Sequence, residues 1–379
     1  MTTMTTERPV TEAGLRVLLV DDSAVVRRIM LDVLRSEPGI AHVGSASSGR
    51  AALGMIDELK PHVVVLDVEM PGIDGRQTLA ELHRRWPQLP VVMFSSVSDK
   101  SAAATFDAMA QGAKDFVTKP SMAGSLAGAL ASVKANLVPI VHTWGSISQT
   151  RLKAERLRAV AKAAPSRPVV TPTVKAIQRQ QGSGRVAAVV MASSTGGPNA
   201  LNEIVPALSG NLRVPVLLVQ HMPVTFTRHL AERLDGISAL HVVEAAPGTV
   251  VEAGHLYVAR GGEHMEVRRS GGQIVIELNS KPPENSCRPA ADVLFRSAVA
   301  AWGGDLLGVV LTGMGQDGML GAKAIVEAGG TVLVQDADSS VVWGMPGAVV
   351  NAGLAAEVLP LSGMATAMEA RVARGRARQ

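Results

Sequence analysis

The chain has 379 residues, of which 47% are hydrophobic and only 3% aromatic, so it can form two or three domains with aliphatic cores. Its single cysteine, Cys287, excludes an internal disulfide and predicts a reducing, cytoplasmic location, and no stretch has the length of a membrane span or the pattern of a secretory signal. The net charge of +4 divides into −1 for residues 1–150, +8 for 151–185 and −3 for 186–379, a distribution that argues against a dedicated nucleic-acid-binding protein.

Residues 15–137 follow an N-terminal tail (1–14) and alternate strand and helix patterns. Continuous apolar runs of this kind are typical of strands buried on both faces of a parallel sheet. Five strands with intervening helices predict a doubly wound α/β domain. The strands are expected at 16–20, 42–46, 62–67, 90–94 and 114–118.

Residues 138–185 differ in composition from both neighbours and predict a basic, flexible linker. Residues 165–185 are rich in Pro, Gly, Gln and basic side chains and show no clear period, although 151–164 has helical spacing. We therefore expect this segment to connect two independent domains.

Residues 186–370 resume the alternation and predict a second doubly wound α/β domain, followed by a basic tail at 371–379. Short alternating patterns between 240 and 280 predict a small antiparallel excursion from the parallel sheet. Buried strands are expected at 186–191, 214–220, 305–313 and 330–336, and the short alternating strands at 255–259, 264–269 and 273–278.

Polar residues follow four strands of the first domain at their carboxyl ends. Asp21 and Asp22 follow the first strand and Asp67 ends the third, so three carboxylates converge and need a cation, for which oxygen ligands favour Mg²⁺. Ser95 and Lys119 end the fourth and fifth strands and offer a hydroxyl and an ammonium to phosphoryl oxygens. Singly, these residues also fit helix caps or a surface ion pair; together they indicate a phosphoryl site.

With these motifs, residues 16–137 resemble a two-component receiver domain of flavodoxin-like strand order. The resemblance implies that Asp67 is the phosphoacceptor. It also implies that the side chains of Asp22 and Asp67 and the backbone carbonyl of Glu69 bind Mg²⁺ directly, while Asp21 acts through water.

The receiver resemblance further implies how phosphorylation is sensed. Ser95 takes the position that senses the phosphoryl group, Lys119 pairs with that group, and Phe116 takes the position of the aromatic switch residue. The Lys119–Pro120 peptide bond is expected to be cis.

Three polar residues also stand at strand ends in the second domain. Ser194 lies in a Gly-rich turn after the first strand, His221 follows the next, and Asp317 follows a later one. A serine hydroxyl becomes a nucleophile when an imidazole takes its proton and a carboxylate orients that imidazole. Glycines flank Met314, whose N–H can then stabilise an oxyanion. Taken alone, Ser194 and Asp317 also fit helix N-caps and His221 a structural role.

These segments resemble the catalytic domain of chemotaxis protein-glutamate methylesterases, the CheB family. The motifs are Ser-Thr-Gly-Gly at Ser194–Gly197, Gln-His-Met at Gln220–Met222 and Thr-Gly-Met-Gly-x-Asp-Gly at Thr312–Gly318. The resemblance implies that Ser194 is the nucleophile, His221 the general base and Asp317 its orienting partner, with the Met314 N–H in the oxyanion hole.

Two positions depart from the family pattern. Ala192 replaces a glycine two residues before the nucleophile, and Ala290 replaces a serine in the Arg-Pro-Ser-x-Asp-Val-Leu-Phe motif. The catalytic assignment is unaffected by these changes. Cys287 has no cysteine-protease context around it and is interpreted as a spectator.

Together the two resemblances predict a cytoplasmic, phosphorylation-activated enzyme of chemotactic adaptation. Its substrates would be glutamate γ-methyl esters, and also glutamines, on methyl-accepting chemotaxis receptors, and its phosphodonor a chemotaxis histidine kinase. The resemblance implies Mg²⁺ in the receiver domain, no cofactor for ester hydrolysis, and contact with membranes only through receptor arrays. The unphosphorylated receiver is expected to cover the catalytic site. The alternatives are a receiver-coupled DNA-binding regulator and a non-catalytic scaffold.

Overall fold

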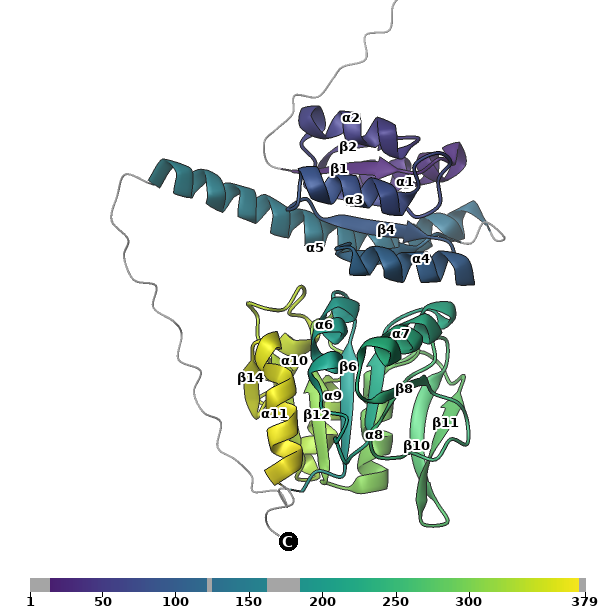
Figure 1. Cartoon of the computed structure of the whole chain (residues 1–379), viewed down its shortest axis with the longest axis vertical. Helices are drawn as coiled ribbons and strands as arrows, with labels where there is room; N and C mark the ends of the chain where they lie inside the picture. The colour runs from purple at the N-terminus through teal and green to yellow at the C-terminus, as the bar shows by residue number, and fades with distance from the viewer. Residues whose placement is uncertain (1–13, 121–124, 162–184, 375–379) are drawn as a thin grey trace, which may run out of the picture. The chain divides into compact units, whose positions relative to one another are not determined.

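The computed structural model describes residues 14–120, 125–161 and 185–374, and the chain divides into two compact units, Met1–Val170 and Thr171–Gln379 (Figure 1). Both units are α/β folds with a parallel sheet, as the sequence predicted. Among the described residues, no helix is both long enough and apolar enough to cross a membrane.

The N-terminal unit is a five-stranded parallel sheet with helices on both faces (Figure 1). Its strands are β1 (Leu15–Val20), β2 (Ile40–Ala46), β3 (Val63–Asp67), β4 (Val91–Ser95) and β5 (Asp115–Thr118), and the helices between them are α1 (Ala24–Ser36), α2 (Gly49–Leu59), α3 (Gly75–Arg85) and α4 (Asp99–Ala110). The strand order β2-β1-β3-β4-β5 is the flavodoxin-like one. Every residue of β3 and β4 is buried, which explains their unbroken apolar runs.

Side-chain caps define where the helices of this unit begin. Ser23, Ser48 and Ser98 each accept a hydrogen bond from the first turn of the helix that follows. Asp74 and Gln77 form a capping box at the start of α3. Each cap turns the chain sharply after a strand, so the loops that carry polar residues gather at the carboxyl edge of the sheet.

The helix α5 (Leu126–Ala161) is longer than predicted and runs through Pro139. Residues 138–161 are therefore helical and not part of a flexible linker; residues 162–184 lie outside the described part. The helix continues past the proline because Val141 and Trp144 are buried beyond it. Gly145 also allows a close approach to β1, since a Cβ there would lie 2.9 Å from the Leu15 Cδ1.

The C-terminal unit contains a seven-stranded parallel sheet and a separate two-stranded sheet. The large sheet contains β6 (Ala188–Ser193), β7 (Val216–Gln220), β8 (His241–Glu244), β9 (His255–Val258), β12 (Leu306–Val310), β13 (Thr331–Gln335) and β14 (Glu357–Leu359), in the order β14-β13-β12-β6-β7-β9-β8. The small sheet pairs β10 (His264–Ser270) with β11 (Gln273–Asn279). The helices are α6 (Gly197–Ile204), the short η1 (Val205–Ala207), α7 (Val224–Ile237), α8 (Ala291–Trp302), α9 (Met319–Glu327), α10 (Met345–Asn351) and α11 (Leu361–Arg374).

The antiparallel excursion is smaller than expected. Among the strands of the described residues, β10 and β11 are the one antiparallel pair. The segment 255–259, predicted to belong to the excursion, forms β9 and lies parallel between β7 and β8 in the main sheet. A short alternating strand at a sheet margin has the same pattern in either direction, so periodicity alone could not decide its partner.

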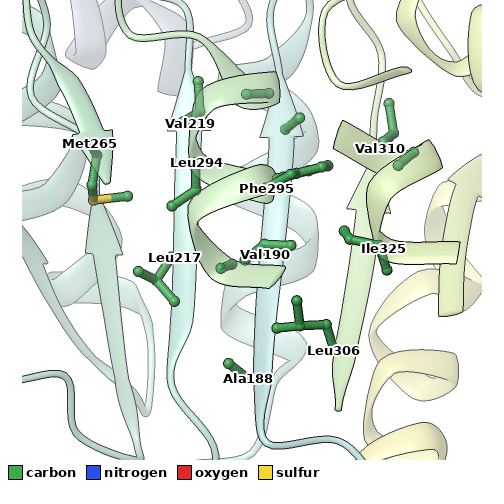
Figure 2. Packing of buried hydrophobic residues seen from close by; sticks show 14 of the residues in the cluster. Ala188, Val190, Leu217, Val219, Met265, Leu294, Phe295, Leu306, Val310 and Ile325 are labelled. Atoms are coloured by element: carbon green, nitrogen blue, oxygen red, sulfur yellow. The ribbon is translucent and has the colours of Figure 1, made fainter. Parts of the chain in front are cut away.

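Aliphatic side chains fill the space between this sheet and α8, α9 and α10. Figure 2 shows Val190 and Leu217 from the sheet packed beneath Phe295 and Leu294 of α8. Phe295 is fully buried, and replacing it with alanine would cost about 3–5 kcal/mol of stability. This core holds β6, β7 and β12 side by side. The strand order reverses direction between β6 and β12, which is where open α/β sheets bind ligands.

Candidate functional site

Ser194 lies immediately after β6, at the point where the strand order reverses. Its backbone N–H donates to the Thr312 carbonyl, 3.0 Å away, which ties the turn to the loop after β12. The sequence left open that Ser194 caps the next helix, but the N-cap of α6 is Gly196, which has φ +76° and no side chain. The neighbouring Ser193 hydroxyl donates to the Gln220 side chain at 2.7 Å.

His221 and Asp317 form a close pair at the adjacent strand ends. The His221 Nε2 lies 2.7 Å from the Asp317 Oδ2, and the two side chains are 12% and 2% exposed. The backbone N–H of His221 donates to the Ser193 carbonyl at 3.2 Å, which joins the backbone at His221 to the residue before Ser194. The structure thus brings together the turn and the pair that the sequence singled out.

Asp317 caps a different helix from the one the sequence suggested. Its oxygens accept the backbone N–H groups of Ala291 at 2.6 Å and Asp292 at 3.1 Å, at the start of α8, whereas the N-cap of α9 is Gly318. Burial favours the neutral acid, but the hydrogen bonds from His221 and from these N–H groups outweigh it and lower the pKa of Asp317. Asp317 is therefore held as a carboxylate.

The imidazole of His221 has a different neighbour at each nitrogen. Nε2 contacts Asp317, so an N–H there makes Nδ1 the basic nitrogen. Nδ1 lies 3.6 Å from the Cys287 sulfur. Burial acts to lower the pKa of His221, but the Asp317 hydrogen bond, with the Cys287 contact, raises it to about 9. Cys287, interpreted from the sequence as a spectator, thus contacts the candidate base.

The loop after β12 passes close to the Ser194 turn. A Cβ on Gly313 would lie 2.9 Å from the Ser194 Cβ, so only glycine fits at this approach. Gly315, with φ +83°, turns the chain directly after Met314, whose side chain is 40% exposed. The backbone at Met314 therefore belongs to the same strand-end cluster as Ser194.

The two departures from the family pattern have local explanations. Ala192 is fully buried, and a Cβ on Gly318 would lie 3.6 Å from its methyl group, an ordinary contact distance. Ala290 is the N-cap of α8 and has no hydroxyl to cap it, and Asp317 accepts the first N–H groups of that helix instead.

The acidic residues of the N-terminal unit also cluster. Asp21, Asp22 and Asp67 each place a carboxylate oxygen within 4.8 Å of the others. Lys119 lies between two of them, with its ammonium 2.8 Å from Asp21 and 2.7 Å from Asp67. Burial raises the pKa of Asp67 to about 6, although Lys119 opposes this shift. The Glu69 N–H donates to the Asp67 Oδ1 at 3.2 Å.

The predicted switch residues lie around this cluster. The Ser95 hydroxyl is fully buried and accepts a 2.9 Å hydrogen bond from Thr105 of α4, so it is directed toward that helix. Phe116 packs against Phe106 with ring centroids 6.1 Å apart. The cis bond predicted at Lys119–Pro120 is not found: within the described residues, the cis bond is Arg288–Pro289.

The sequence analysis missed the contacts that two residues, Cys287 and Asn285, make with the His221–Asp317 pair. Cys287 contacts the imidazole, and Asn285 donates to Asp317 at 3.1 Å and to Asp292 at 2.9 Å. The one sequence signal at these residues is the segment before Arg288-Pro289, which has neither strand nor helix period.

A receiver fold with clustered carboxylates, joined to an α/β unit with a paired histidine and aspartate, defines a response regulator with an α/β output domain. Residues 17–131 match the family model of the response regulator receiver domain, and residues 189–368 match that of the CheB methylesterase. The chain belongs to the CheB methylesterase family.

Relatives match nearly the whole chain. The protein-glutamate methylesterase/protein-glutamine glutaminase of Trichodesmium erythraeum is 42% identical over 354 residues, covering 92% of this chain and 97% of the relative. The protein of the same name from a Nocardioides species is 43% identical over 366 residues, covering 96% and 97%. The crystal structure of the Thermotoga maritima CheB methylesterase catalytic domain is 39% identical, covers 50% of this chain and 98% of that chain, and gives a TM-score of 0.48.

Proposed function

We propose that this protein hydrolyses glutamate γ-methyl esters on chemotaxis receptors and deamidates receptor glutamines. The observation that carries the proposal is the 2.7 Å contact between His221 and Asp317 beside the Ser194 turn, at the reversal point of the sheet. The names of the relatives, protein-glutamate methylesterase/protein-glutamine glutaminase, support the substrate class.

In the proposed reaction, Ser194 attacks the ester carbonyl while His221 accepts the hydroxyl proton at Nδ1. Asp317 stays ionised, accepts the Nε2–H and stabilises the imidazolium. The Met314 N–H stabilises the oxyanion of the tetrahedral intermediate. His221 then returns the proton to the departing methoxide, so that methanol leaves and an acyl-enzyme on Ser194 remains.

The second half of the reaction repeats the first with water as the nucleophile. His221 takes a proton from water, the hydroxide adds to the acyl carbon, and the proton returns to the Ser194 oxygen as the free carboxylic acid leaves. An amide passes through the same kind of intermediate with ammonia as the leaving group, which is the proposed basis of glutamine deamidation.

We propose that the N-terminal unit is phosphorylated on Asp67 by a chemotaxis histidine kinase. Asp22, Asp67 and the Glu69 carbonyl would hold Mg²⁺ directly and Asp21 through water, and this oxygen-only donor set fits that ion. When bound, Mg²⁺ supplies charge neutralisation for the carboxylates and the incoming phosphoryl group. Lys119 contributes the ammonium that pairs with the phosphoryl oxygens.

Phosphorylation is proposed to activate the C-terminal unit through Ser95 and Phe116. To reach a phosphoryl group on Asp67, the Ser95 hydroxyl must exchange its contacts with Thr105 and the Ser101 carbonyl of α4. This exchange would shift α4 and leave room for Phe116 to move. The reaction would take place in the cytoplasm, at receptor arrays.

The test is methanol release from membranes that contain methylated receptors, with and without a small-molecule phosphodonor. We expect release by the wild-type protein and stimulation by the phosphodonor. The variant Asp67→Asn should keep the basal rate and lose the stimulation. No methanol release under either condition would reject the proposed function, and equal stimulation of the variant would reject Asp67 as the phosphoacceptor.

A further inference from the structure

A tight turn at residues 284–287 precedes α8, and its residues Asn285 and Cys287 contact Asp317 and His221. The Glu284 N–H donates to the Cys287 carbonyl at 3.1 Å, and the Cys287 N–H returns a bond to the Glu284 carbonyl at 2.8 Å. Between them, Asn285 and Ser286 both have positive φ, at 52° and 62°. Two successive left-handed residues closed by such a pair of bonds form a type I′ turn.

This backbone is costly for residues other than glycine. A non-glycine residue in the left-handed region is disfavoured because its Cβ approaches the carbonyl oxygen, and such residues persist where the surrounding structure demands them. Asn tolerates the conformation better than most residues, but Ser does not share that preference. The strained turn therefore requires a reason beyond the connection of two elements.

The reason lies in the side chain that the turn presents. The Asn285 amide nitrogen donates to the Asp317 Oδ1 at 3.1 Å and to the Asp292 Oδ2 at 2.9 Å. Both acids are buried, and burial together with the Asp317 charge raises the pKa of Asp292. Two buried acids this close repel each other unless donors lie between them.

The two acids also cross-link two helices. Asp317, which precedes α9, accepts N–H groups at the start of α8, whereas Asp292 in the first turn of α8 accepts the Gly321 N–H of α9 at 2.6 Å. Asn285 is the bridge at the centre of this exchange. It occupies the Asp317 Oδ1, while Oδ2 contacts His221.

The turn itself is anchored on its outer side. Arg296 of α8 donates two hydrogen bonds to the Glu284 carboxylate, at 2.7 and 2.6 Å. The ionisable groups that surround the pair are therefore Cys287 at Nδ1 of His221, Asp292 across the Asn285 bridge, and the Glu284–Arg296 ion pair behind the turn.

We propose that Asn285 is a positioning residue for the esterase reaction, acting through Asp317. It holds two buried carboxylates together and orients Asp317 so that Oδ2 meets the imidazole. This inference rests on the proposed function, because Asp317 matters to the reaction only if His221 is its base.

Two glycine variants in the same turn separate the amide from the backbone. Asn285→Gly places at 285 a residue that accepts positive φ, so it removes the side-chain amide without straining the backbone. Ser286→Gly relaxes the backbone of the same turn and keeps the Asn285 amide. For Asn285→Gly we expect kcat for methanol release to fall roughly 10- to 100-fold with little change in KM, because two hydrogen bonds to charged groups are lost. Ser286→Gly should match the wild-type protein.

The pH dependence gives a readout that a purely structural role would not change. Without the amide donor, the Asp317 carboxylate carries more negative potential toward His221 and favours the imidazolium. The rising limb of kcat/KM should therefore move to higher pH in Asn285→Gly and further still in Asn285→Asp, which adds a third carboxyl group. Ser286→Gly should leave the limb in place.

Several results would overturn the inference. The inference fails if Asn285→Gly has the kcat of the wild-type protein and the same rising limb of kcat/KM against pH. It also fails if Ser286→Gly loses as much kcat as Asn285→Gly. If thermal melting shows that Asn285→Gly does not fold, Asn285→Asp provides the test, and an unchanged limb there counts against the proposal. Two further measurements distinguish the failures. Absence of methanol release by the wild-type protein rejects the proposed function, and release by Ser194→Ala rejects Ser194 as the nucleophile. An active wild-type protein, an inactive Ser194→Ala and a wild-type-like Asn285→Gly together reject only the role of Asn285.

Discussion

The replacement Asp317→Asn tests the electrostatics of the candidate site. In the wild-type protein the pKa of His221 rises from 6.5 to about 9, although burial acts to lower it. At 1.36 kcal/mol per unit, this corresponds to roughly 3 kcal/mol of preference for the imidazolium. Since only neutral imidazole can accept the Ser194 proton, kcat/KM should rise about tenfold per pH unit up to pH 9.

With asparagine at 317 the carboxylate is gone and burial dominates the remaining shift. The rising limb should then move down by roughly 2.5 pH units, from about pH 9 toward pH 6.5. The plateau rate should nevertheless fall by on the order of 10³- to 10⁴-fold. Without the Asp317 carboxylate, nothing holds the His221 proton on Nε2 or stabilises the imidazolium that forms when His221 accepts the Ser194 proton. Asp317→Asn also places an NH₂ group opposite either the Ala291 N–H or the Asn285 amide, both of which donate to Asp317 in the wild-type protein. Because two facing donors destabilise the fold, melting curves must show that the variant is folded.

The assay is initial-rate methanol release between pH 5.5 and 10, on the same methylated membranes for both proteins. A rising limb that stays at the wild-type pH in folded Asp317→Asn would refute the reasoning. It would mean that the limb reports a group other than His221.

Three further predictions concern other parts of the chain. Because the pKa of His221 is raised in the folded state, its contribution to the free energy of unfolding is complete below about pH 6.5 and is lost as pH rises through about 9. Urea unfolding at a series of pH values should show this loss of stability, and His221→Gln should not show it. Gly313→Ala should lower kcat roughly 10- to 100-fold, since the new Cβ would come within 2.9 Å of the Ser194 Cβ, whereas Gly236→Ala, which meets no atom within 4 Å, serves as the neutral control. Lys119→Ala should abolish stimulation by a phosphodonor and keep basal methanol release, because it removes the ammonium beside Asp67; retained stimulation would exclude that role.

Strong hydrophobic patterns made most of the fold predictable. The strands β3, β4, β6 and β7 were identified because strands buried on both faces read as apolar runs, which here are broken only by one polar residue at the carboxyl end of each strand. The continuation of α5 was missed because residues 138–185 were assigned to a linker on their composition, whereas buried residues such as Trp144 continue the packing of the helix beyond Pro139. The short strands β8 and β14 and the helix α10 have too few residues for a period to emerge.

The candidate sites were predictable to the extent that strand ends converge. Ser194, His221 and Asp317 could be grouped because each follows a parallel strand, and the same reasoning grouped the acids around Asp67. Asn285 and Cys287 lie in a tight turn, and no periodicity connects Asn285 with Asp317, 32 residues away, or Cys287 with His221, 66 residues away. Their contacts with Asp317 and His221 depend on two successive residues in the left-handed region, which a sequence pattern does not reveal.

The most direct test of the central claim, that Ser194 is the nucleophile, compares methanol release by the wild-type protein, Ser194→Ala and Cys287→Ala. Ser194 lies one residue after Ser193, whose carbonyl accepts the His221 backbone N–H, and the Cys287 sulfur lies 3.6 Å from the His221 Nδ1. We predict that Ser194→Ala releases no methanol while it still accepts a phosphoryl group on Asp67, and that Cys287→Ala retains release. Methanol release by Ser194→Ala at the wild-type rate, or loss of release only in Cys287→Ala, would contradict the account.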